Sequence, residues 1–205
     1  MLLQVAQLGH PILRQKAESV KDINDPKVQE LIDNLIATVM DVDGVGIAAP
    51  QVYQPWRLFI LASHPNPRYP NAPEMEPTAI INPKIISTSP ELIKDWEGCL
   101  SIPGIRSKVL RHKAITVTFF NRDGKRERKK FEDFIARIFQ HEYDHLEGIV
   151  FLDKLVDMSE TITEKEYQKL MKKEKEEKEK KVNSKKPAKQ KTKSKNLKKQ
   201  ISAKA

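Results

Sequence analysis

The feature that most constrains the fold is the segment His-Glu-Tyr-Asp-His at residues 141–145. A spacing of four residues places both imidazoles on one face of a helix, close enough to share a metal ion. Helical periodicity runs from Glu132 to Leu146, and Gly148 is typical of the position just past a helix end. The fold must therefore bring this helix to a metal site. Glu142 would lie beside the ion, where it can take a proton from metal-bound water.

A third ligand has to come from elsewhere, because a catalytic ion usually has three protein ligands and one open position. Glu147 lies two residues after His145, so the helix turns it away from the ion. The better candidate is Cys99, the only cysteine, which follows Gly98 in a segment where the backbone can approach closely. Taken singly, a lone cysteine also fits a buried hydrophobe, and the histidines fit surface positions. The joint pattern favours a metal site formed by Cys99, His141 and His145.

The net charge of +9 arises entirely in the C-terminal part of the chain. Residues 154–205 contain 18 Lys and 8 acidic residues, hence +10, which leaves −1 for residues 1–153. We therefore predict a neutral globular domain over 1–155 and a Lys-rich extension over 156–205. The extension should begin as a helix and become disordered over 180–205, where there is no acidic residue. Its composition is typical of a solvated tail or of a segment that contacts RNA phosphates.

The cysteine content and the hydropathy pattern limit the compartment. A single cysteine excludes an intramolecular disulfide and favours a reducing environment. The first residues lack the basic and apolar regions of a signal peptide, and no stretch approaches the roughly 20 apolar residues that span a bilayer. These features predict a cytoplasmic protein with no membrane contact.

The remainder of the domain is predicted to contain one more helix and several short strands. Asp25 is a typical N-cap and Pro26 a typical first helical residue, so a helix is expected over 26–42. Five prolines predict an ordered loop over 64–77. Runs of β-branched and aromatic residues predict strands at 57–62, 79–87, 113–121 and 125–131, with a hairpin turn at 121–124. The expected fold is α+β, with antiparallel sheets around a central metal-binding helix that packs against the N-terminal helix.

Three segments carry a family resemblance: Gly-Val-Gly-Ile-Ala-Ala-Pro-Gln at 44–51, Glu-Gly-Cys-Leu-Ser at 97–101 and Gln-His-Glu-Tyr-Asp-His-Leu-Glu-Gly at 140–148. In this order and spacing they resemble the signature motifs of bacterial-type peptide deformylases, and the resemblance covers residues 1–155. Ile47 stands where leucine is common, and the proline-rich loop over 62–79 is longer than in some members. The resemblance implies hydrolysis of the formyl group from formyl-methionine at the N terminus of nascent polypeptides, with release of formate.

The resemblance also implies residue roles. Glu142 would act as general base and acid for attack by metal-bound water. The side chain of Gln51 and the backbone N–H of Leu100 would stabilise the oxyanion. The residues implied to bind the substrate peptide and its methionine side chain are Gly44, Val45, Gly46, Gly98, Phe134 and Ile138. For Phe134 and Ile138, which lie on the predicted helix, packing in the protein core is an equally good explanation.

The identity of the ion does not follow from the ligand types, because two imidazoles and a thiolate suit zinc, iron, nickel or cobalt. The resemblance implies Fe2+ as the physiological ion, with Zn2+, Ni2+ or Co2+ in the isolated protein. It also implies that the substrate emerges from the ribosome. The Lys-rich extension is therefore a candidate contact to the ribosome through ribosomal RNA.

Two other functions remain open from the residues. A general zinc endopeptidase would use the same helix motif but would need a third His or Glu ligand. A non-enzymatic RNA-binding protein is favoured only by the Lys-rich extension, and its metal site would be structural. Structural zinc sites usually have four protein ligands, whereas the sequence offers three, which favours catalysis.

The groups that support the ligands are only partly predictable. A metal-bound histidine usually donates its second N–H to a carboxylate or a carbonyl, so Asp144 or a backbone carbonyl is a candidate partner. Arg106 and Arg111 follow the cysteine closely. Both are candidates to pair with Glu97 or Asp144, and surface positions are equally consistent with the sequence.

Overall fold

The computed structural model describes residues 1–184 and divides the chain into two compact units after Lys165. The first unit contains both β-sheets and the helices α1 and α2. Helix α3, Glu164–Ser184, begins at the end of this unit. Disorder was predicted over 180–205; residues 180–184 instead belong to α3, and residues 185–205 lie outside the described residues. Over residues 1–184, no helix has the length and apolar character needed to cross a membrane.

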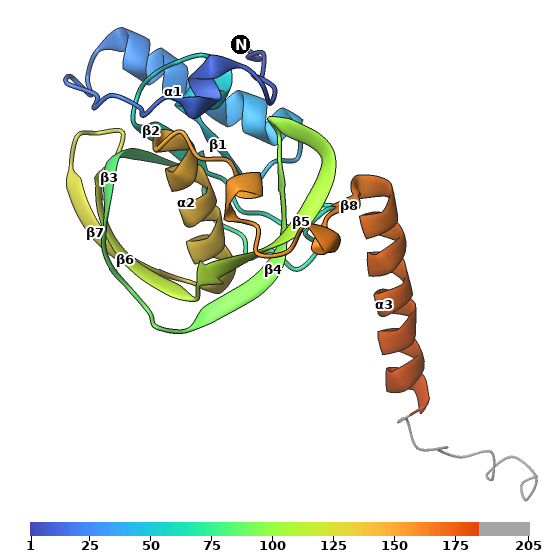
Figure 1. The fold of residues 1–205 in the computed structure, drawn as a ribbon. Coiled ribbons are helices and arrows are strands. Elements are labelled where there is room, and N and C mark those ends of the chain that lie inside the picture. The colour runs from blue at the N-terminus through green and yellow to red at the C-terminus, as the bar shows by residue number, and fades with distance from the viewer. Residues whose placement is uncertain (185–205) are drawn as a thin grey trace, which may run out of the picture. The chain divides into compact units, whose positions relative to one another are not determined.

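The larger sheet has five antiparallel strands in the order β1-β2-β3-β6-β7 (Figure 1). The hairpin turn predicted between the last two strands forms, with the Gly124 N–H donating to the Asn121 carbonyl and Gly124 at φ +75°. All four predicted strands are present in this sheet. Its strands are β1 Gly46–Ala48, β2 Leu58–Leu61, β3 Thr78–Thr88, β6 Ala114–Phe120 and β7 Arg126–Glu132.

The smaller sheet was not predicted as strands. It has the order β4-β5-β8, with β4 at Leu92–Cys99, β5 at Ile102–His112 and β8 at Ile162–Thr163. The ladder of β4 and β5 pairs Glu97 with Ser107 and Cys99 with Ile102, with a register irregularity between them. Strand β4 therefore ends at Cys99, and the turn of the β4–β5 hairpin follows directly.

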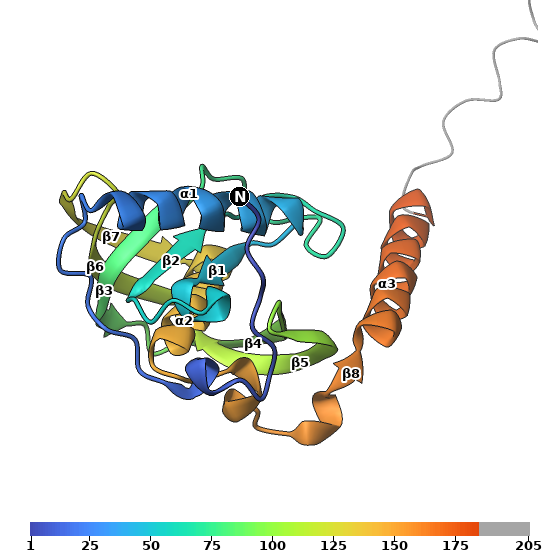
Figure 2. The same cartoon turned by 90° about the horizontal axis from the view of Figure 1, so that it is seen from above.

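The helices lie on opposite faces of the larger sheet (Figure 2). On β2, Leu58 and Ile60 pack with α1, Pro26–Asp41, whereas Phe59 and Leu61 pack with α2, Asp133–Leu146. Phe59 meets Phe139 of α2 edge to face at 5.0 Å. The expectation that the central helix packs against the N-terminal helix is therefore wrong, because β1 and β2 lie between them. Both faces of β2 are buried, which explains its continuous apolar run.

Short helical turns and caps fix the remaining connections. The Asp25 carboxylate accepts from the Lys27 N–H at 2.9 Å and caps α1 as predicted. Gly148 follows α2 at φ +72°, where a side chain would be strained. The short 3-10 helices are Pro11–Arg14, Ala49–Val52, Phe151–Lys154 and Met158–Glu160.

Helix α2 is buried over most of its length, between the larger sheet and the β4–β5 hairpin (Figure 1). Ten of its 14 residues are buried, and six of these are polar. Buried polar groups require partners, so this helix must be surrounded by complementary charges or ligands.

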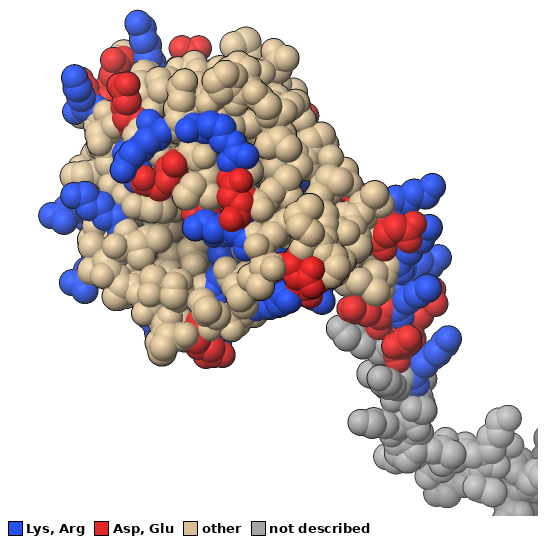
Figure 3. All heavy atoms as spheres, viewed as in Figure 1, with Lys and Arg blue, Asp and Glu red and all other residues tan. Residues whose placement is uncertain are grey.

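On the surface, acidic and basic side chains are interspersed over the face shown in Figure 3, consistent with a nearly neutral body.

Candidate metal centre and active site

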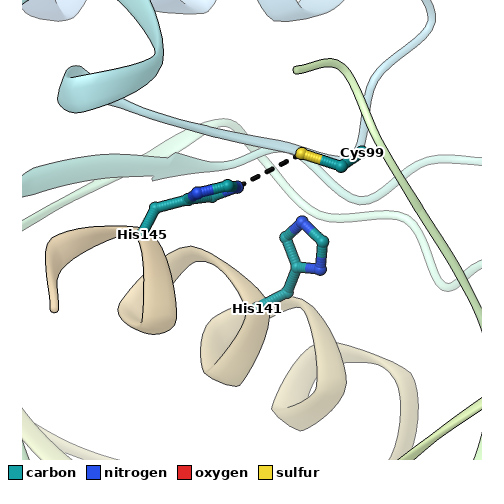
Figure 4. A group of neighbouring side chains, drawn as sticks. All are labelled: Cys99, His141 and His145. Atoms are coloured by element: carbon teal, nitrogen blue, oxygen red, sulfur yellow. Dashed lines mark hydrogen bonds between the residues drawn. The ribbon is translucent and has the colours of Figure 1, made fainter. Parts of the chain in front are cut away.

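The three predicted metal ligands lie together (Figure 4). His141 and His145 occupy successive turns of α2, and Cys99 faces them from the end of β4. Their ligand atoms all lie within 4.8 Å of one another, and the Cys99 Sγ is 3.3 Å from the His145 Nε2. Within residues 1–184, this is the only such cluster of His, Cys, Asp or Glu donors.

The donor set and its burial suit a divalent transition-metal ion. Two imidazole nitrogens and one thiolate are ligands for zinc or iron, and the spacing of the donors allows all three to reach one ion. Both histidines are buried, whereas Cys99 is partly exposed. Three protein ligands would leave a coordination position open, which is typical of catalytic sites.

Glu97 is the centre of a buried ionic network behind the ligands. Its Oε2 lies 2.9 Å from the His141 Nδ1, and a proton on that nitrogen leaves Nε2 to bind an ion. Arg111 donates to both Glu97 oxygens at 2.9 and 3.0 Å, and Arg137 donates to one at 2.8 Å. Arg111 also donates to Asp144 at 2.5 Å. The partner that orients His141 is therefore Glu97 rather than Asp144, and the pairing expected for Arg111 is confirmed.

The network keeps a buried carboxylate ionised. Burial alone would raise the pKa of Glu97, but the positive charge of Arg111 and the hydrogen bond with His141 hold it well below its usual value. Glu97 is only 3% exposed, so its charge depends on these partners. Removal of one partner would leave uncompensated charge in the interior.

Glu142 occupies a different environment from Glu97. Burial raises the pKa of Glu142 to about 7, with the charge of His141 opposing the shift. Its Oε2 is buried and has no hydrogen-bond partner among residues 1–184. A Cβ atom on Gly46 would lie 2.6 Å from the Glu142 Oε1. The missing side chain at Gly46 therefore makes room for this carboxylate.

Gln51 lies beside the cysteine, as the motif resemblance led us to expect. The 3-10 helix Ala49–Val52 carries it, and its Oε1 accepts from the Ala48 N–H at 2.8 Å. This bond directs the side-chain NH2 to the Cys99 Sγ at 3.5 Å and to the Ser101 Oγ at 3.2 Å. Leu100, between Cys99 and Ser101, packs against the hydrophobic cluster formed by residues of α1, β1 and β2. Gln51 is thus held rigidly at the cluster of ligand atoms.

The residues expected to bind substrate are distributed around the same centre. Val45, Phe134 and Ile138 belong to one hydrophobic cluster, in which Ile138 is buried and the other two are partly buried. A Cβ on Gly44 would lie 3.6 Å from the Leu100 Cδ1. Gly98 precedes the cysteine and lies against the guanidinium of an arginine, Arg106, which is described below. The described contacts therefore place Gly44 against Leu100, Gly46 against Glu142, and the three apolar residues in one shared cluster.

Three groups near the site were predicted wrongly or not at all. Arg106 does not pair with Glu97; its Nε donates to Glu164 at 2.5 Å and its Nη1 to the Tyr69 hydroxyl at 2.5 Å. Arg137 was overlooked, although it precedes His141 by one helical turn and so shares its face. Tyr69 lies in the proline-rich loop, where no local pattern indicates a role.

Comparisons with known proteins agree with this geometry. The profile of the family described as polypeptide deformylase matches residues 2–161. Peptide deformylase 2 of Nostoc sp. strain PCC 7120 is 59% identical over 172 residues, 84% of this chain and 96% of the relative. A Met-Ala-Ser-bound class I type b peptide deformylase from Acinetobacter baumannii has a TM-score of 0.74 at 43% identity, covering 76% and 99% of the two chains. The Synechococcus elongatus peptide deformylase in complex with actinonin has a TM-score of 0.69 at 34% identity, covering 77% and 81%.

An α+β fold with a buried His-Glu-x-x-His helix and a neighbouring cysteine defines a metal-dependent hydrolase. The chain belongs to the polypeptide deformylase family. Enzymes of this family remove the N-terminal formyl group from nascent peptides, and this chain is an enzyme of that type. The endopeptidase and the non-enzymatic RNA-binding alternatives are thereby set aside.

Proposed function

We propose that this deformylase binds one divalent ion through Cys99, His141 and His145 and uses Glu142 to move the proton. One observation carries the proposal: three ligand atoms lie within 4.8 Å of one another, next to a buried carboxylate oxygen without a described partner. When bound, the ion would polarise the formyl carbonyl and make water more acidic.

Glu142 would act as the general base and then the general acid. It accepts a proton from the attacking water and passes it to the amide nitrogen, so that the C–N bond breaks and formate leaves. A carboxyl group whose pKa lies near 7 can perform both transfers at neutral pH. The peptide is released with a free amino group.

Gln51 and the backbone N–H of Leu100 would stabilise the negative charge that develops on the formyl oxygen. Donors fixed before the reaction are more effective than mobile ones, because no reorganisation accompanies the charge development. The bond from Ala48 to the Gln51 Oε1 supports this role, since it sets which end of the amide faces the site. Removal of one such donor typically lowers kcat by about 100- to 1000-fold.

The substrate would lie as an extended peptide between two segments of the chain. Gly44 and Gly46 precede and begin β1, and Gly98 lies at the end of β4, so both segments offer backbone groups for pairing. We place the methionine side chain at Val45, Phe134 and Ile138. The Acinetobacter relative with bound Met-Ala-Ser supports binding of a peptide that begins with methionine.

Fe2+ is the ion that we propose for the enzyme in the cell, and the cytoplasm is its proposed compartment because its substrates are nascent peptides. A ferrous ion and a thiolate ligand are both sensitive to oxidation. Protein purified anaerobically with iron should therefore lose activity in air. Stable aerobic activity with iron still bound would refute this choice of metal.

The Lys-rich extension is proposed to contact ribosomal RNA. Residues 185–205 contain nine Lys and no acidic residue, and ribosomal RNA presents phosphates near the emerging substrate. Truncation after Ser184 should weaken ribosome binding, and the difference should shrink as salt is raised. Equal binding of both forms at low salt would remove this part of the proposal.

The decisive test of the catalytic proposal measures formate release from formyl-Met-Ala-Ser together with metal content. Glu142→Gln keeps the shape of the side chain but cannot act as a base. It should retain the metal and lose at least about 100-fold in kcat. Cys99→Ala should lose metal as well as activity. Full activity in either variant would overturn the assigned role.

A further inference from the structure

The proline-rich loop between β2 and β3 is ordered by its own side chains. Asn66 is buried, and its Oδ1 accepts from the backbone N–H groups of Arg68 and Tyr69, each at 3.0 Å. The Ser63 hydroxyl donates to the Pro73 carbonyl at 2.6 Å, and the Met75 N–H donates back to the Ser63 carbonyl at 3.0 Å. Long loops without secondary structure usually have a function. The deformylation chemistry proposed above does not require this one.

Two adjacent side chains tie the loop to both segments proposed to bind the substrate. Arg68 donates to the Val42 carbonyl at 2.5 Å and to the Asp43 carbonyl at 2.8 Å, immediately before Gly44. Tyr69 accepts from the Arg106 Nη1 at 2.5 Å. The loop therefore links the segment before β1 to Arg106 of β5.

The Arg106 side chain lies between Tyr69 and the end of β4. The Arg106 side chain is almost fully buried, and its guanidinium lies over the Tyr69 ring at 5.1 Å. A Cβ atom on Gly98 would lie 2.8 Å from the Arg106 Nε. The guanidinium thus packs directly against the backbone of Gly98, next to the cysteine ligand.

Tyr69 also touches the proposed methionine site. Its ring lies against the Phe134 ring, with centroids 5.1 Å apart and the planes tilted by 52°. Phe134 is in the first turn of α2, packed with the cluster that includes Val45 and Ile138. Tyr69 is partly buried and is not a member of the hydrophobic core clusters.

We propose that Tyr69 is a positioning residue that sets selectivity for the first side chain of the substrate. The Tyr69 ring holds Phe134 in place, and the hydroxyl bond to Arg106 holds the ring. This inference rests on the proposed function, because it takes Phe134 as part of the methionine site. It adds a residue from the proline-rich loop to a site otherwise built from Val45 before β1 and from Phe134 and Ile138 of α2.

The test compares kcat/KM for formyl-Met-Ala-Ser and formyl-Phe-Ala-Ser in metal-loaded enzyme. Tyr69→Ala should lower the preference for Met over Phe by about fivefold, since loss of a packing contact relaxes the shape of an apolar site. The change should appear mainly in KM for the Met substrate, with kcat nearly unchanged. Tyr69→Phe keeps the contact with Phe134 but loses the bond from Arg106, so its preference should lie between those of Tyr69→Ala and wild type. Asn71→Ala, an exposed position in the same loop, is the matched control and should behave as wild type.

The outcomes separate this inference from the proposed function. If Phe134→Ala alters the Met-to-Phe preference and Tyr69→Ala does not, the methionine site stands and the role of Tyr69 is refuted. If Phe134→Ala leaves the preference unchanged, the methionine site and the role of Tyr69 both fail. Equal losses of kcat for both substrates in Tyr69→Ala would indicate a purely structural residue, and would also refute the proposal.

Discussion

Gly46 is the position where one methyl group tests the placement of the proposed base. A Cβ atom there would lie 2.6 Å from the Glu142 Oε1 and 2.9 Å from its Cγ and Cδ. Ordinary van der Waals contact begins at 3.4 Å, so the carboxylate must move by about 0.8 Å in Gly46→Ala. The moving atoms are the end of a side chain, so the fold should tolerate the change.

The expected effect is therefore on catalysis. A displacement of about 1 Å in a reacting group costs about 100-fold in rate, and kcat of Gly46→Ala should fall by this order. Glu142→Asp shortens the side chain and relieves the overlap. In the Glu142→Asp background, Gly46→Ala should therefore lower kcat much less than it does in the wild-type background. The difference would appear as a coupling energy in a double-mutant cycle.

The matched control is Gly44→Ala, two residues earlier. Its Cβ would lie 2.7 Å from the Val39 Cγ2 and 3.1 Å from the Val39 carbonyl oxygen, so the clash is with α1. We expect a loss of about 1–3 kcal/mol in the free energy of unfolding. The assays are formate release, metal content and urea unfolding on the same samples. A metal-loaded Gly46→Ala enzyme with kcat within about twofold of wild type would refute the placement of Glu142.

Three further perturbations address the surrounding charges. Arg111→Met would leave Glu97 and Asp144 without their main cation, and urea unfolding should show a loss of about 3–5 kcal/mol; a loss below about 1 kcal/mol would contradict the buried network. Glu97→Gln should weaken metal affinity by about 10- to 100-fold in an equilibrium chelator competition, and unchanged affinity would exclude its role in orienting the ligand. Burial raises the pKa of Glu147, but the hydrogen bonds and positive charges of Arg57 and Lys16 together outweigh it and lower the pKa below 4.5. The stability that these contacts contribute is present above pH 4.5 and is lost as the pH falls through the folded-state pKa of Glu147. On acidification, the free energy of unfolding should therefore fall more in wild type than in Glu147→Gln. Equal losses in the two proteins would contradict this.

The elements with strong local signals were predictable from the sequence. The N-cap Asp25 and the apolar face of the first helix place α1 within a residue of its observed end, Asp41. The hairpin turn at Asn121–Gly124 sets the β6–β7 register. These features depend on residues close together in the chain, where capping and turn chemistry decide the conformation.

The β4–β5 hairpin lacked such a signal because its buried positions are charged. Glu97, Arg106 and Arg111 are all buried, so the strands do not show the alternation of apolar and polar residues by which strands are recognised. Their partners come from α2, from the proline-rich loop and from the start of α3, far away in sequence. Burial of these groups is favourable only once those partners are in place. The local sequence pattern of the strands cannot show whether those partners are present.

The two arginines that follow the cysteine show where reasoning from composition ends. Both were candidates for the same carboxylates, yet their surroundings differ: Arg111 meets Glu97 and Asp144, and Arg106 meets Tyr69 and Glu164. Arg111 comes five positions after Arg106, and an odd spacing places two side chains on opposite faces of a strand. Arg111 pairs with the carboxylate that lies beside His141, and Arg106 connects the proline-rich loop to the proposed substrate site. Residues outside the three motifs would therefore support both the proposed metal site and the proposed selectivity.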